Sequence, residues 1–361
     1  MPVAPLNGHR LVLGLALLAV VLVVPHVLAI GEPFHFNYNE GWNLYRTALV
    51  QDGGQLHGAP PGLWVVNYPP LSFHIAACLD RLIGDLVLTG RLLSLAGLAG
   101  TCLLAGACVA HITASRTAAI CAALLPVIWI GLYQADRIAM NDPQLLATAF
   151  VMAAVWCYLR AGRSAWLVAS AMAVAVGLFT KSNLMDLPLA ILLHLAWSRR
   201  WRDLAVWTAT GAAAGTALLA TSLAVDGPHF LAHVLLPRDY LPLKGLRMTA
   251  GFTLYLAGAL ALAVLWGRHH LRPTPRGFLV LAAVIGVAVG ALLAPGGGID
   301  RNSFFDAAVL DASPDALLRP GEARERFTVP VVDAILATYL PALSTASFII
   351  LLPIVAKESA P

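Results

Sequence analysis

The sequence predicts an all-α protein, a polytopic transmembrane helical bundle of about ten spans. Hydrophobic residues make up 59% of the chain and charged residues only 12%, whereas a soluble domain carries roughly a quarter charged residues. Apolar runs of the length that crosses a bilayer recur along the whole sequence, and no long stretch has the polar face of a soluble domain. We therefore expect a single transmembrane domain over residues 1–361.

A bilayer core of ~30 Å requires about 20 apolar residues per helix. The predicted spans are residues 11–30, 86–110, 118–133, 145–159, two within 166–197, 204–225, 248–266, 278–294 and 331–355. The first of these could also be a cleaved signal sequence, because small residues follow the helix-breaking Pro25.

Basic clusters decide how often residues 166–197 cross the membrane, since this segment is long for one helix and short for two. Arginines at 160–163 precede it and arginines at 199–202 follow it. If both clusters face the cytoplasm, the chain must cross twice and turn near residues 181–183.

The same rule orients the whole chain. The inner segments of this arrangement contain eleven basic and only two acidic residues, the basic ones being Arg10, Arg116, Arg160, Arg163, Arg199, Arg200, Arg202, Arg268, Arg272, Arg276 and Lys357. We therefore expect the N-terminus in the cytoplasm and two long outer segments, 31–70 and 295–330. The net charge of +4 is spread between apolar runs, so no nucleic-acid partner is expected.

The first outer segment mixes aromatic and polar residues. From residue 38 to 50 the spacing of Trp42, Tyr45 and Leu49 predicts a helix lying in the membrane interface, with Glu40 near its start. Glu40 could be presented to a cleft, or could simply stabilise the helix dipole. The aromatic residues suit an interfacial belt equally well.

Further polar residues gather at the outer ends of other predicted spans. Asp142 precedes Pro143, which is a natural helix start and makes Asp142 a candidate helix cap. Lys181 and Asn183 lie at the predicted hairpin tip and must face water or a protein partner, Asp186 being the nearest candidate.

Three more candidates lie further along the chain. Arg238 and Arg247 could reach lipid headgroups or bind a phosphate, and Asn302 follows the glycines 296–298, which permit close approach of the backbone to a ligand.

Six segments in this order resemble the GT-C membrane glycosyltransferases, the superfamily of the protein O-mannosyltransferases and the lipid A aminoarabinose transferases. The likeness is in particular to a bacterial branch, glycosyltransferase family 39 or RgtA/B/C/D-like. The segments that carry the likeness are NYNEGWNLYR, NYPPLSFH, GRLLS, RIAMNDPQLLA, FTKSNLMDLPLA and GGGIDRNSFFDA.

The resemblance implies an inverting transfer of a sugar from a polyprenyl-phosphate donor to an envelope acceptor, a lipid or a polysaccharide, outside the bacterial cytoplasmic membrane. Glu40 would be the carboxylate base, and Asp142 would orient the acceptor or share a metal with it. Cations would stabilise the leaving phosphate. The implied donor-binding residues are Lys181 first, then Arg137, Arg238 and Arg247, together with Tyr68, Asn183 and Asn302.

One departure concerns a metal. Many relatives have two adjacent acids in the first outer loop, whereas Asn39 precedes Glu40 here. This departure weakens the prediction of a metal site, so we expect no required cofactor and leave a divalent metal open.

Two other functions remain open. One is a transporter, flippase or polymerase of lipid-linked saccharides, which would carry charges near the bilayer midplane, and the other is a non-catalytic scaffold. Since Pro361 follows the last predicted span closely, a shortened family member whose acceptor recognition is reduced or supplied by a partner is also expected.

Overall fold

The computed structural model describes residues 8–255, 272–299 and 304. Within them every regular element is a helix, and one isolated bridge joins Tyr240 to Gly296. The described helices are α1 (Gly8–Leu28), α2 (Tyr38–Gln51), α3 (Leu71–Ile83), α4 (Leu86–Thr113), α5 (Arg116–Tyr133), the 3₁₀ turn η1 (Ala135–Arg137), α6 (Pro143–Leu159), α7 (Ser164–Thr180), α8 (Asp186–Trp197), α9 (Trp201–Val225), α10 (Phe230–Val234), α11 (Pro242–Tyr255) and α13 (Pro275–Leu293). The all-α prediction is confirmed.

Five of these helices, α1, α4, α5, α9 and α13, are long and apolar enough to cross a membrane, and α6, α7 and α8 are shorter apolar helices. The chain is thus a multi-pass membrane protein. The predicted division of segment 166–197 is present, since it forms two helices, α7 and α8, which are separated by the turn at 181–185. Residues 256–266 and 331–355 of the last predicted spans lie outside the described residues, so the expected number of about ten spans is not confirmed.

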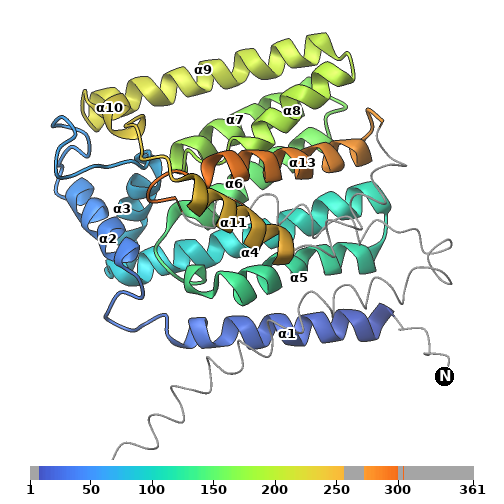
Figure 1. The fold of residues 1–361 in the computed structure, drawn as a ribbon, viewed down its shortest axis with the longest axis horizontal. Coiled ribbons are helices and arrows are strands. Elements are labelled where there is room, and N and C mark those ends of the chain that lie inside the picture. The colour runs from blue at the N-terminus through green and yellow to red at the C-terminus, as the bar shows by residue number, and fades with distance from the viewer. Residues whose placement is uncertain (1–7, 256–271, 300–303, 305–361) are drawn as a thin grey trace, which may run out of the picture.

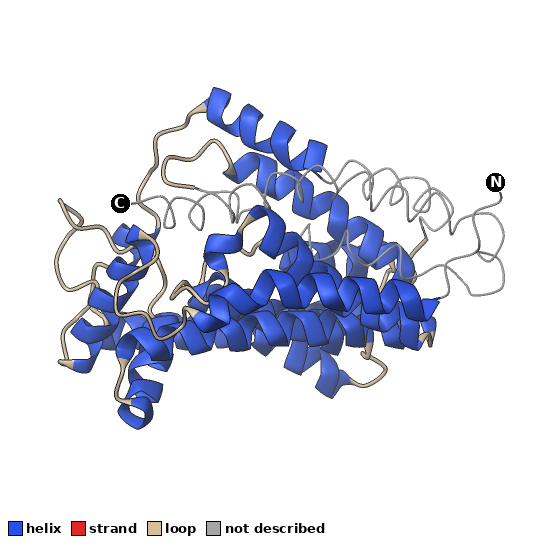
Figure 2. Ribbon diagram, turned by 90° about the horizontal axis from the view of Figure 1, so that it is seen from below, coloured by secondary structure: helices blue, strands red, loops and turns tan. Residues whose placement is uncertain are grey.

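The long helices run lengthwise beside one another, and most of the loops lie at one end (Figures 1 and 2). Helix α4 packs against α5 and α6, α6 against α7, and α7 against α9. Gly97 of α4 makes the closest of these contacts possible, because a Cβ there would lie 2.5 Å from the backbone nitrogen of Leu146 in α6. A side chain at this position would force the two helices apart.

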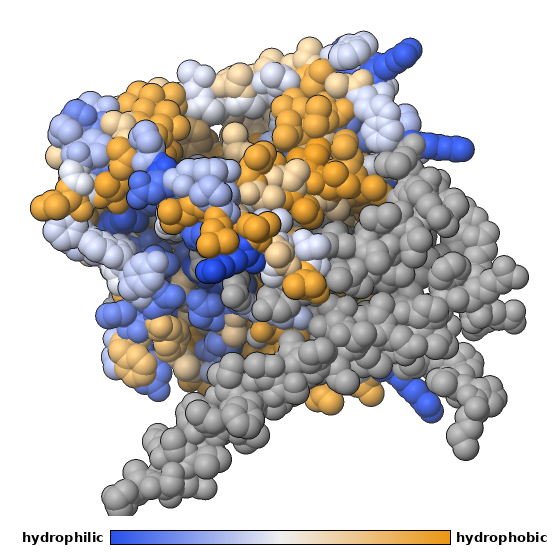
Figure 3. All heavy atoms as spheres, viewed as in Figure 1, coloured by the Kyte–Doolittle hydropathy of each residue, from blue (hydrophilic) through white to orange (hydrophobic). Residues whose placement is uncertain are grey.

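The short helices α2, α3 and α10 lie together at one end of the bundle, called the α2 end below (Figure 1). The helix that the sequence predicts over residues 38–50 is present as α2, and Pro70 directly precedes α3. Hydrophilic residues gather near the α2 end and at the opposite tips, whereas hydrophobic residues cover much of the surface between them (Figure 3). This distribution suits a bundle whose middle faces lipid.

Candidate functional site

A cavity of about 680 Å³ lies at the α2 end, a size typical of small-molecule sites. Its wall combines α2, the loop after α2, the turn between α7 and α8, and part of α10. Four cationic side chains line it, from Arg46, Arg137, Lys181 and Arg238, and among the described lining residues there is no aspartate or glutamate. The cavity therefore favours an anionic ligand.

Lys181 and Arg137 share one buried carboxylate, that of Asp142. The Lys181 ammonium donates to Oδ1 of Asp142 at 2.6 Å, and the Arg137 guanidinium donates to Oδ2 at 3.1 Å. Asp142 also caps α6, since its Oδ1 accepts from the backbone N–H of Gln144. The predicted cap is confirmed, and Lys181 is bonded to Asp142.

Burial alone would raise the pKa of Asp142, but the positive charges of Lys181 and Arg137 outweigh it and hold this pKa below its usual range. The carboxylate is 5% exposed and stays ionised. Because Lys181 and Arg137 line the cavity while Asp142 lies behind them, the two cations are positioned to bind an anion from the other side.

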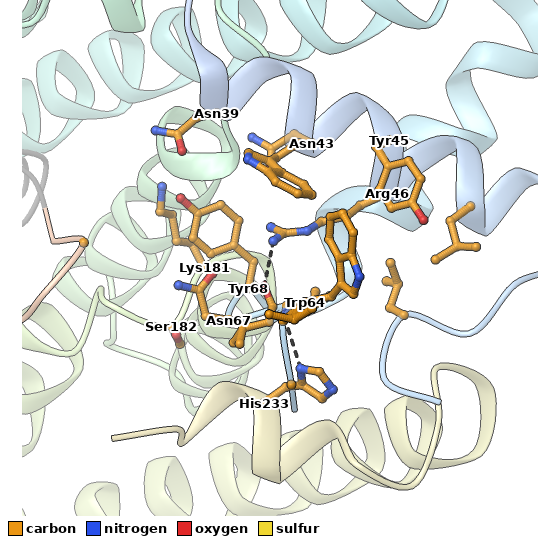
Figure 4. A pocket seen from close by; sticks show the side chains of 18 of the residues that line it. Asn39, Asn43, Tyr45, Arg46, Trp64, Asn67, Tyr68, Lys181, Ser182 and His233 are labelled. Atoms are coloured by element: carbon orange, nitrogen blue, oxygen red, sulfur yellow. Dashed lines mark hydrogen bonds between the residues drawn. The ribbon is translucent and has the colours of Figure 1, made fainter. Parts of the chain in front are cut away.

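Tyr68 connects the cationic residues to the loop after α2. The Lys181 ammonium lies 4.6 Å and the Arg46 guanidinium 5.6 Å from the centre of its ring, distances typical of cation–π contacts. Figure 4 shows Tyr68 and Lys181 on one side of the cavity and Trp64 and Tyr45 on the other.

Glu40 occupies a different environment from the one that the sequence predicts. It is fully buried and absent from the cavity wall, where its neighbour Asn39 lies instead. The Arg91 guanidinium donates to both of its carboxylate oxygens, at 2.9 and 3.0 Å. Backbone N–H groups of Phe36 and Asn141 donate to the same oxygens at 2.8 and 3.1 Å.

These four donors determine the charge state and the contacts of the Glu40 carboxylate. Burial raises the pKa of Glu40, but its hydrogen bonds with Arg91 and with the two backbone N–H groups together lower it below the usual value. Since Asn141 directly precedes Asp142, Glu40 fixes the turn that carries Asp142. The role of Glu40 as base stays a prediction, and its surroundings favour a positioning role.

The other predicted site residues divide into three groups. Asn183 and Arg238 line the cavity, Asn183 bonded to Gln144 and Arg238 to the carbonyl of Gly297. Arg247 is exposed on α11 and is absent from the cavity wall. Asn302, like most of the predicted outer segment 295–330, lies outside the described residues.

Sequence reasoning missed Arg91, Arg46 and two histidines, His57 and His233. His233 bridges the loop after α2, because its Nδ1 accepts from the N–H of Val66 at 3.1 Å and its Nε2 bonds the carbonyl of Ala59 at 2.7 Å. A lone arginine inside the apolar span 86–110 was the available signal, since such a charge requires a partner. No comparable sequence signal identifies the two histidines.

In the part of the chain that the structure describes, no three histidine, cysteine, aspartate or glutamate side chains form a group that could hold a metal ion. The carboxylates of Glu40 and Asp142 each accept from separate sets of nitrogen donors. The shared metal between them therefore stays a prediction without geometric support among these residues.

Comparison with known proteins yields one family match. Residues 67–225 match the family described as dolichyl-phosphate-mannose-protein mannosyltransferase. No curated protein matches the sequence significantly.

Two solved structures have a similar fold. ArnT from Cupriavidus metallidurans bound to undecaprenyl phosphate is 15% identical with a TM-score of 0.66, and the match covers 91% of this chain and 64% of ArnT. The oligosaccharyltransferase AglB from Archaeoglobus fulgidus, in complex with an inhibitory peptide and a dolichol-phosphate, is 12% identical with a TM-score of 0.59, and the match covers 94% of this chain and 56% of AglB.

The chain thus spans less than two thirds of the length of either structure. Together the family match and the two structures confirm the resemblance that the sequence motifs predict: the chain has the fold of the GT-C membrane glycosyltransferases.

Proposed function

We propose that this protein transfers a sugar from a polyprenyl-phosphate carrier to an envelope acceptor, at a cavity on the outer face of the bacterial cytoplasmic membrane. The observation that carries the proposal is the pair of cations, Lys181 and Arg137, which line the cavity and are held in place by the buried Asp142. The ArnT structure of similar fold holds undecaprenyl phosphate, a ligand of the same chemistry.

The leaving group of such a transfer is a lipid phosphate that gains negative charge as the glycosidic bond breaks. Preorganised cations stabilise that charge without needing to donate a proton. In the proposed complex the phosphate binds Lys181 and Arg137 from the cavity side, while Asp142 holds both cations from behind.

In the proposed reaction the oxygen of the acceptor hydroxyl forms a bond to the anomeric carbon, its proton passes to water in the cavity, and the bond from this carbon to the phosphate oxygen breaks. The products are the glycosylated acceptor and the free polyprenyl phosphate, and attack from the opposite side inverts the anomeric carbon. Glu40 acts by holding the turn in front of Asp142.

The first experiment measures binding of polyprenyl phosphate to the purified protein in lipid nanodiscs. Lys181→Gln should weaken binding at least tenfold, because a lost charge-assisted contact costs about 1.5–3 kcal/mol. Arg247→Gln is the matched control, since Arg247 is exposed and absent from the cavity wall, and it should bind as the native protein does. Equal effects of the two substitutions would contradict the proposed site.

The second experiment follows sugar release from a panel of polyprenyl-phosphate sugars. The native chain should turn over at least one donor, and Asp142→Asn should strongly lower turnover because a neutral amide no longer holds Lys181 and Arg137 by charge. No turnover of any donor by native protein that binds the lipid would contradict transfer and favour a carrier-binding scaffold.

A further inference from the structure

An aromatic surface lies across the cavity from Lys181 and is not used by the proposed chemistry. It consists of Tyr38, Trp42, Tyr45 and Trp64, and is called the aromatic wall below. All four side chains line the cavity and are well exposed, Trp42 at 42% and Trp64 at 66%. The rings of these two tryptophans meet edge to face, with centroids 5.4 Å apart.

The aromatic wall is held rigidly by the opposite face of α2. Tyr38, Trp42 and Tyr45 follow one another at helical spacing on one side of α2. On the other side Glu40 is bound by Arg91, and the buried Asn43 donates to the carbonyl of Asn141 at 2.7 Å. These buried polar contacts prevent α2 from turning its aromatic face away from the cavity.

Trp64 is also held in place by neighbouring contacts, although it lies in a loop. Val65 directly after it accepts a hydrogen bond from Arg46 at 3.0 Å, and His233 holds both Val66 and Ala59. Figure 4 shows Arg46 and His233 bonded to this stretch beside Trp64. Ordering a loop around an exposed indole costs conformational entropy, which a ligand for that indole would explain.

We propose that the aromatic wall binds a saccharide, so that the acceptor is a glycan rather than a peptide or a simple lipid. This inference rests on the proposed function and names the acceptor class of the same cavity. The C–H face of a pyranose ring is apolar and slightly positive, and it packs on the electron-rich face of an aromatic ring. The sugar hydroxyls then need amide partners, which Asn39 and Gln55 offer in the same wall.

The location distinguishes the aromatic wall from an interfacial belt. Belt residues lie around the lipid-facing circumference, whereas these four line a single hollow together with Lys181. A saccharide on the aromatic wall and a lipid phosphate at Lys181 would occupy opposite sides of the cavity, as Figure 4 shows for Trp64 and Lys181. An acceptor hydroxyl could therefore approach the donor sugar from the side opposite to its phosphate.

The test is calorimetric titration of the protein in nanodiscs with unlabelled hexasaccharides of β-1,4-glucose, α-1,4-glucose, β-1,4-N-acetylglucosamine and α-1,6-mannose. At least one should bind, and Trp42→Leu and Trp64→Leu should each weaken its binding about tenfold, the value of one stacking contact. Trp201→Leu is the matched control, because Trp201 is 61% exposed but begins α9 at the opposite end. It should bind as the native protein does.

Three results would overturn the inference: no hexasaccharide binds to the native protein, the control weakens binding as much as Trp64→Leu does, or brominated lipids strongly quench the fluorescence that Trp64 contributes. Tyr45→Ala gives a second variant should Trp64→Leu misfold, since Tyr45 is 60% exposed. Lys181→Gln should keep hexasaccharide binding while losing polyprenyl phosphate. Native protein that binds a hexasaccharide but no polyprenyl phosphate would contradict the proposed function alone.

Discussion

The ion pair between Glu40 and Arg91 joins three segments far apart in the sequence. Both side chains are completely buried, and Arg91 also donates to the carbonyls of Ile30, Glu32 and Phe34. Every strong donor of this guanidinium therefore has an acceptor. A buried pair with complete hydrogen bonding holds its surroundings in one arrangement, and removal of either partner leaves a charge without compensation.

We expect Glu40→Gln and Arg91→Met to lower the free energy of unfolding by about 3–5 kcal/mol each. The double variant should lose much less than the sum, because neither substitution then leaves a buried charge unpaired. Thermal unfolding in nanodiscs measures the four proteins of this cycle.

Asp203→Asn is the control for that cycle. It breaks the pair between Arg200 and Asp203, whose side chains are 35% and 32% exposed, and should cost less than about 1 kcal/mol. Additive losses in the double variant would mean that Glu40 and Arg91 act independently. Loss of activity in Glu40→Gln alone cannot identify a base, since the same substitution loosens the turn before Asp142.

His57 gives the loop after α2 a dependence on pH. Burial, followed by smaller effects of its neighbours, lowers its pKa from 6.5 to about 4. The imidazole is neutral in the fold and contacts the carbonyl of Val66 through Nε2 at 3.2 Å. As pH falls from 6.5 towards 4, the unfolded chain takes up a proton that the folded chain does not.

His57 should therefore contribute no pH dependence above about pH 6.5, and between pH 6.5 and 4 it should lower the free energy of unfolding with a slope of up to one proton. The lowered pKa of Glu40 affects stability only below pH 4.5, its usual value. The effects of His57 and Glu40 on stability therefore fall in different pH ranges. Unfolding temperatures over this range test the expectation, and His57→Asn should make the curve less steep above pH 4.5. An unchanged curve in the variant would assign the slope to another group.

At the scale of elements, the contact of α4 with α6 depends on Gly97. A methyl group there would meet the backbone of Leu145 and Leu146 at 2.5–2.8 Å. We expect Gly97→Ala to destabilise the fold by about 1–3 kcal/mol, the usual cost of overpacking. Thermal unfolding provides the measurement.

Gly14→Ala is the matched control, since Gly14 also lies inside an apolar helix but nothing surrounds its Cβ position within 4 Å. It should leave stability unchanged or raise it by up to about 1 kcal/mol. Similar losses of stability in both variants would mean that alanine acts within each helix rather than on the contact between α4 and α6.

Helices could be predicted from the sequence more fully than their contacts. Apolar length located α4, α5 and α9, and arginine clusters separated α7 from α8, because lipid acts on each segment independently of the rest. The partner of Glu40 was not predictable in this way, since its contacts with Arg91 and Asn141 span 51 and 101 residues. Pairing at such separations depends on packing, which local patterns do not encode.

At the scale of the whole molecule, the proposed function requires the α2 end to face outward. In a Cys78→Ser background, which removes the exposed cysteine, a cysteine substituted for Ser182 should react with a membrane-impermeant maleimide in intact cells. A cysteine substituted for Arg163 should react only after permeabilisation, because Arg163 is exposed beyond the opposite end, just before α7. The reverse pattern would place the cavity in the cytoplasm and contradict the proposal.

The contacts of Glu40 also bear on the order in which parts of the nascent chain fold. All the partners of Glu40 lie between residues 36 and 141, so this junction needs no residue beyond 141 in order to close. The cavity needs residues 181–183, 233, 238 and 298–299 as well, which emerge later. A chain whose synthesis stops early would therefore have the Glu40 junction formed but the binding site incomplete. Such an assembly intermediate resides in the membrane but does not yet bind a carrier lipid.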